Sequence, residues 1–181
     1  MDSKHPTVAG VDLAAVYNHV EWFIERRFGV PVTMAQVVVP NTGDFDGSQI
    51  QIHHDQDVEQ ALFILIHLFG HTVQWNLSDE LRQLGLQTQP GKTDDELLRI
   101  RDYECDATRY SLSLLHQAGV TDLDRWVSDW WYADWRYLEH FYRTAHKLDV
   151  RSLLWPGHGA LLQPLSIPHF QPQRFVSRWS F

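Results

Sequence analysis

One stretch of this sequence, residues 61–75, restricts the possible folds more than any other. It is apolar nearly throughout, but it contains two histidines, His67 and His71. A helix that is apolar nearly all round is expected at the centre of a core. Residues four apart lie one above the other on a helix, so both imidazoles can reach a single metal ion. Burying two ring systems without partners would be costly, which favours a metal site over two core histidines.

Composition indicates one globular domain. Of the 181 residues, 44% are hydrophobic and 21% are charged, as in folded rather than disordered chains. The net charge of −8 argues against nucleic acid as a partner. A single cysteine, Cys105, excludes an intrachain disulfide and fits the reducing cytoplasm. The N-terminus lacks the order of a signal peptide, and the longest apolar run is far short of the ~20 residues that span a bilayer. We therefore expect a cytoplasmic protein with no membrane partner.

The first third of the chain predicts a helix followed by a hairpin. Apolar residues recur at helical spacing over 11–28, and Gly29 and Pro31 mark the end of that helix. Residues 32–39 are rich in β-branched side chains and stop at Pro40, residues 41–47 are turn-forming, and residues 48–53 alternate. This order predicts an antiparallel hairpin over about 32–53, with one face on the core.

Three further helices are predicted. The central one begins at a cap, Asp55 or Asp57, and runs to about residue 75. The next begins at Thr93 and runs to about residue 117. The last spans about 121–147 and is rich in tryptophan, and a proline-containing tail follows from residue 149. The predicted fold is a mainly helical α+β single domain over 1–181, with a metal-site core at about 11–117 and an aromatic helix and wrapping tail at 118–181.

A metal held by two helical histidines needs at least one more protein ligand, commonly a carboxylate. Glu104 on the following helix is the best candidate, and Asp106 is the alternative. Thr108 lies one turn after Glu104, where its hydroxyl could hydrogen-bond a glutamate ligand. Two histidines and one carboxylate suit zinc, iron or another divalent ion, and these residues alone do not separate the metals.

At these residues the chain resembles the ImmA/IrrE family of zincin-like metallo-endopeptidases, which are gluzincins. The family patterns run roughly F-x-x-x-H-E-x-x-H and E-x-x-A-[ND]-x-F-A. Residues 63–71 match the first except at Leu68, and residues 104–111 match the second loosely, with Thr108 and Tyr110 as departures. The likeness covers roughly residues 11–117. It implies a zincin fold with His67, His71 and Glu104 as zinc ligands.

Leu68 stands where that family has the glutamate that polarises metal-bound water and passes its proton to the leaving amine. A hydrolase of a peptide or amide would then need another base. The candidates are His53, His54, Tyr103 and Tyr110, with Glu59 further behind. One alternative is a catalytically degenerate relative that serves as a binding or regulatory module. Another is a metal enzyme acting on a small molecule in a pocket lined by the aromatic helix. The oligomeric state stays open.

Overall fold

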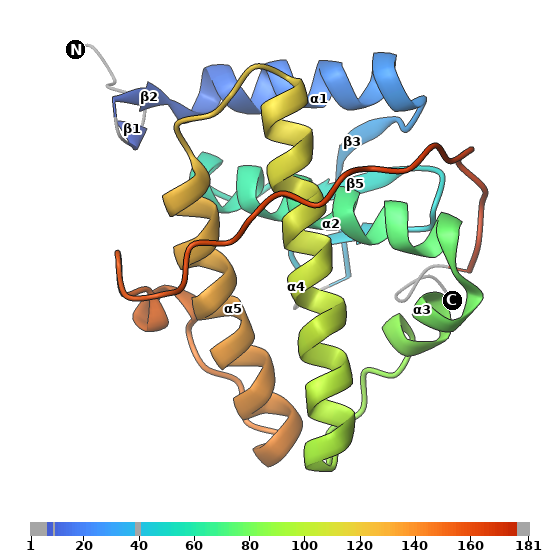
Figure 1. The fold of residues 1–181 in the computed structure, drawn as a ribbon, viewed down its shortest axis with the longest axis vertical. Helices are drawn as coiled ribbons and strands as arrows, with labels where there is room; N and C mark the ends of the chain where they lie inside the picture. Colours follow the sequence, from blue (N-terminus) through green and yellow to red (C-terminus); the bar gives the residue numbers. More distant parts are fainter. Residues whose placement is uncertain (1–6, 9, 39–40, 177–181) are drawn as a thin grey trace.

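The computed structural model describes residues 7–8, 10–38 and 41–176 and shows a small sheet set among helices (Figure 1). This confirms the predicted mainly helical α+β class. The elements, in chain order, are β1 (Thr7–Val8), β2 (Val11–Asp12), α1 (Leu13–Phe28), β3 (Val32–Ala35), β4 (Gly43–Phe45), β5 (Ile50–His53), α2 (Val58–Leu77), α3 (Asp79–Gly85), α4 (Asp94–Gln117), α5 (Asp124–Thr144) and the 3₁₀ helix η1 (Val150–Leu153).

The predicted antiparallel hairpin is wrong. β3 and β5 pair in parallel, with Val32 opposite Ile50, and β4 pairs antiparallel on the other edge of β5, with Gly43 opposite Ile52. The turn-forming segment itself supplies β4. This strand pairs antiparallel with one edge of β5, and β3 pairs in parallel with the other edge. Residues 39–40, the predicted end of the first strand, lie outside the described residues.

Local capping explains most of the helix boundaries. Asp12 caps α1, which ends at Gly29 in the left-handed region with φ 68°, as predicted. Asp57 caps α2, and Thr93 forms a capping box with Glu96 at the start of α4. The short helix α3 is absent from the predicted elements, although Ser78 caps it and two acidic residues follow.

Helix α2 lies at the centre of the molecule, and α4 crosses it closely. Gly70 makes this possible, because a methyl group at that position would overlap the backbone carbonyl of Ala107 in α4. One turn further along α4, the Ser111 hydroxyl donates a hydrogen bond of 2.8 Å to the carbonyl of Ile66. The close crossing brings the middle of α4 within reach of the histidine face of α2.

Helix α5 runs antiparallel beside α4, and the tail then crosses back over both helices (Figure 1). After η1 the tail is extended, as predicted, and it is held by hydrogen bonds such as that from the amide of Leu165 to the carbonyl of Arg109. Among the helices of the described ranges, none has the length and apolar character needed to cross a membrane.

Candidate metal centre

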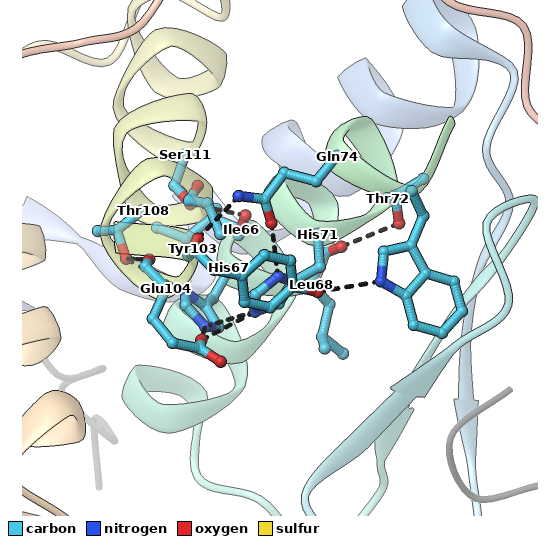
Figure 2. Close-up of polar contacts among 12 residues, drawn as sticks. Ile66, His67, Leu68, His71, Thr72, Gln74, Tyr103, Glu104, Thr108 and Ser111 are labelled. Atoms are coloured by element: carbon cyan, nitrogen blue, oxygen red, sulfur yellow. Dashed lines mark hydrogen bonds and ion pairs between the residues drawn. The ribbon is translucent and has the colours of Figure 1, made fainter. Parts of the chain in front are cut away.

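Three side chains from α2 and α4 converge at one point. The Nε2 atoms of His67 and His71 lie 3.0 Å apart, and each lies 3.0 Å from Oε2 of Glu104. Figure 2 shows the two rings and the carboxylate pointing toward one another. All three residues are buried, with exposed fractions of 9%, 1% and 4%. The structure therefore brings together the three residues predicted as ligands, and they form a group that could hold a divalent metal ion.

The partner of the His71 ring determines which nitrogen carries its proton. The Gln74 amide nitrogen donates a 2.7 Å hydrogen bond to the carbonyl of Tyr103, which leaves its Oε1 facing Nδ1 of His71 at 2.9 Å. An amide oxygen only accepts, so Nδ1 of His71 must be the donor. In the neutral ring, Nε2 then presents its lone pair to His67 and Glu104.

Nδ1 is the donating nitrogen of His67 as well. The Thr108 hydroxyl donates to the carbonyl of Glu104 at 3.1 Å, so its oxygen accepts from Nδ1 of His67 at 3.2 Å. Nε2 of the neutral His67 ring is thereby also left as an acceptor. The sequence places Thr108 beside the carboxylate of Glu104. In the structure it contacts the backbone of that residue instead and orients His67.

Three hydrogen-bond acceptors thus face one another at 3.0 Å, an arrangement that a cation between them would stabilise. The ligand atoms of a tetrahedral zinc site, with bonds of about 2.0–2.2 Å, lie roughly 3.3–3.5 Å apart. The observed spacing is a few tenths of an ångström shorter, which small rotations of the side chains can supply. The donor set and its outer hydrogen bonds fit a divalent metal.

The Glu104 carboxyl is arranged to be ionised. Burial by itself would raise its pKa. The charge of a protonated His71, and the hydrogen bonds that both rings donate from Nε2 when they carry a second proton, outweigh this effect and hold the pKa well below its usual range. An ionised carboxylate is the form that binds a metal.

Aromatic rings fix the planes of the two imidazoles. Phe63 stacks on His67 with ring centroids 5.6 Å apart, and Tyr103 stacks on His71 at 4.6 Å. Phe45 of β4 stacks on His71 at 5.8 Å. The sheet therefore helps to position the histidines, since β4 carries one of these rings.

The group of three side chains borders a cleft of about 800 Å³. Helix α2 contributes Ile64 and Leu68 to its lining, and α5 contributes aromatic residues that include Trp130 and Tyr137. Leu68 packs tightly against Gly43 of β4, where a Cβ would lie 2.7 Å from Cδ1 of Leu68. The position of the missing glutamate is thus occupied by an apolar side chain at the edge of the cleft.

None of the residues predicted as replacement bases is among the described residues that line the cleft. Nδ1 of His53 accepts a hydrogen bond from the amide of Asp55. Tyr103 packs behind His71, and its hydroxyl accepts from the indole of Trp75. Tyr110 packs against the main core, and burial raises its pKa. The contacts described for these side chains are with other parts of the fold, except that the ring of Tyr103 lies beside that of His71.

Two further carboxylates from the predicted set make contacts away from the centre. Asp106, the second candidate for the third ligand, accepts a 2.9 Å hydrogen bond from Arg109. Glu59 accepts hydrogen bonds from the indoles of Trp126 and Trp130, and so ties the start of α2 to α5. Asp106 therefore bonds within its own helix and Glu59 links two helices, and neither belongs to the group formed by His67, His71 and Glu104.

Gln74 contacts the candidate centre, and the sequence pattern did not single it out. A sequence signal for it is nevertheless present, because Gln74 is an amide in an apolar helix, three residues after His71 and therefore on the same face.

In comparisons with known protein families, with characterised proteins and with solved structures, nothing matches this chain. No known relative therefore indicates the function of this protein.

Proposed function

We propose that this protein is a metal-dependent hydrolase of the zincin type that acts on a peptide or amide, with zinc held by His67, His71 and Glu104. The observation that carries the proposal is the convergence of three acceptor atoms, 3.0 Å apart, at the border of a cleft. Two histidines and a glutamate form the ligand set of catalytic zinc sites that keep a position for water or substrate.

Each part of the surrounding structure has a defined task. Gln74 and Thr108 hold the imidazoles in the tautomer that binds metal, and the stacked rings hold them in plane. The cleft is large enough to hold several side chains of a peptide substrate or a compact amide. Its volume lies within the ~300–1,000 Å³ usual for ligand sites. Bound zinc would supply Lewis acidity and lower the pKa of a water molecule toward neutrality.

Metal analysis and hydrolysis assays test this proposal together. We expect the purified protein to bind about one zinc ion per chain after dialysis against zinc-containing buffer, and His67→Ala with His71→Ala to abolish that binding. His116→Ala is the matched control, since His116 bonds to Asp124 outside the centre. Zinc-loaded wild type should also cleave a library of internally quenched peptides. Metal content no higher than that of the double variant would refute the centre.

A second candidate is a metal enzyme that acts on a small molecule. It is favoured by the aromatic side chains of α5, such as Trp130 and Phe141, which border the same cleft as the three ligands. Two histidines and one carboxylate also form the triad of non-haem iron enzymes. Tight and selective retention of iron(II), with no peptide cleavage by the zinc form, would favour this candidate over the hydrolase.

A further inference from the structure

Leu68 has no proton to give or take, so an amide hydrolase built on this centre must find its base elsewhere in the cleft. A general base must lie within hydrogen-bond reach of the attacking water. Besides the three ligands, the ionisable side chains that line the cleft in the described part of the chain are Asp134, Tyr137, Tyr142, Lys147 and Asp149. The base is therefore expected to be one of these five side chains.

Most of these side chains are unsuited to act as the general base. Tyr137 and Tyr142 are phenols and Lys147 is an amine, which suit proton donation better than acceptance near neutral pH. Asp149 is exposed and caps η1, where its carboxylate accepts a 3.0 Å hydrogen bond from the amide of Arg151. Asp134 is the remaining carboxylate, and it is partly buried in the wall that α5 contributes.

The pairing of α4 with α5 brings Asp134 to about the same level along the helix axes as Glu104. Near one end of this antiparallel pair, Asp94 bonds to Arg143 at 2.8 Å, and near the other His116 bonds to Asp124 at 2.7 Å. Both helices rise 1.5 Å per residue. Counting equal numbers of residues inward from these two contacts brings Glu104 level with residues 133–136.

Asp134 also lies on the correct face of α5. Trp130, Asp134, Tyr137 and Phe141 follow one another at steps of three or four residues, and all four line the cleft. Burial and the nearby charge of Asp134 raise the pKa of Tyr137, so this phenol stays protonated beside the carboxylate. The pair provides an acceptor and a donor on the same wall.

We propose that Asp134 is the general base that replaces the missing glutamate, an inference that rests on the proposed amide hydrolysis. Its carboxylate takes a proton from the water whose oxygen forms a bond to the amide carbonyl carbon. The same proton then passes to the amide nitrogen as the carbon–nitrogen bond breaks. The products are one carboxylic acid and one amine, so water is the only co-reactant and Asp134 is regenerated.

The test compares zinc-loaded wild type and three variants on the same quenched-peptide library. Asp134→Asn should lower kcat about 10²-fold or more, with zinc content and thermal unfolding unchanged. Glu139→Gln, the matched loss of a carboxylate from α5 at a residue that is not among the described lining of the cleft, should stay within about twofold of wild type, because Glu139 bonds to Arg143. Adding Leu68→Glu to Asp134→Asn should restore activity, since it supplies the base that zincins normally use.

The outcomes separate this inference from the proposed function. Wild-type activity in Asp134→Asn would overturn the assignment of Asp134 as the base, but it would not contradict the proposed hydrolase function. Activity that appears only after Leu68→Glu would show that the chain lacks a base, and would also overturn Asp134, while the metal centre stands. Zinc-loaded protein that stays inactive with and without Leu68→Glu would overturn both proposals.

Discussion

Gly70 of α2 lies directly against the backbone carbonyl of Ala107 in α4, closer than any residue with a side chain would allow. The contact sits between the two histidines in sequence and one turn from Glu104. It sets the distance between the two helices that supply the three side chains of the candidate centre. The geometry of the centre therefore depends on a residue that has no chemistry of its own.

Gly70→Ala should destabilise the protein and weaken metal binding. Intrinsic helix propensity alone would favour alanine by about 0.5–1 kcal/mol. The added methyl group would instead force α4 away, with a cost at the upper end of the ~1–3 kcal/mol seen for overpacked cores. Urea unfolding gives the sign directly: a variant more stable than wild type would show that the helix crossing is not tight.

Thr108→Val should weaken metal binding without changing the shape of the site. Valine cannot accept the proton of Nδ1 of His67, and losses of such outer contacts typically cost about 10–100-fold in metal affinity. Thr144→Val is the control, because the Thr144 hydroxyl donates to a carbonyl four residues back, as Thr108 does, but contacts no histidine ring in the described part of the chain. Competition with a chromogenic chelator measures the metal affinities of both variants. Equal affinities would show that Thr108 does not contribute to metal binding.

Metal should stabilise the folded chain because the site joins α2 to α4. Free zinc at 100 times its dissociation constant adds about 2.7 kcal/mol to the free energy of unfolding, which corresponds to a rise in Tm of about 5–10 °C for a chain of this size. Differential scanning fluorimetry with zinc and with EDTA measures the shift. His71→Ala should abolish it, and an equal shift in that variant would mean that zinc binds elsewhere.

Glu59→Leu should loosen the contact between α2 and α5. The change leaves the indole N–H groups of Trp126 and Trp130 without their acceptor, and each such buried group costs about 1–3 kcal/mol. Glu59→Gln keeps an acceptor oxygen of the same reach and should cost less. Urea unfolding followed by tryptophan fluorescence compares the two, and equal losses would indicate that charge, not hydrogen bonding, holds the helices together.

Much of the centre can be predicted without the fold. The spacing of His67 and His71 predicts a shared face from helix geometry alone, and the apolar residues around them predict burial. Glu104 is predicted from its place on the next long helix, and the structure brings it to both histidines. These predictions succeed because they depend on local periodicity and on the ligand chemistry of metals.

The incorrect strand pairing arises from contacts between distant segments. Residues 32–35 and 50–53 are strands, as their composition predicts, but their parallel pairing depends on β4 occupying the other edge of β5. The candidate bases remain predictions. Nothing in the local sequence around His53, Tyr103 or Tyr110 shows whether they line the cleft, and none of them is among its described lining residues.

The apolar helix with its two histidines was thus determined by sequence alone, because a periodicity of 3.6 residues and the cost of burying polar groups act within one segment. The tertiary structure decided the rest: the approach of α4 over Gly70, the proton positions set by Gln74 and Thr108, and the place of Asp134 on the α5 wall. Most of these features are contacts between segments far apart in the chain, and such contacts exist only once the whole core has packed.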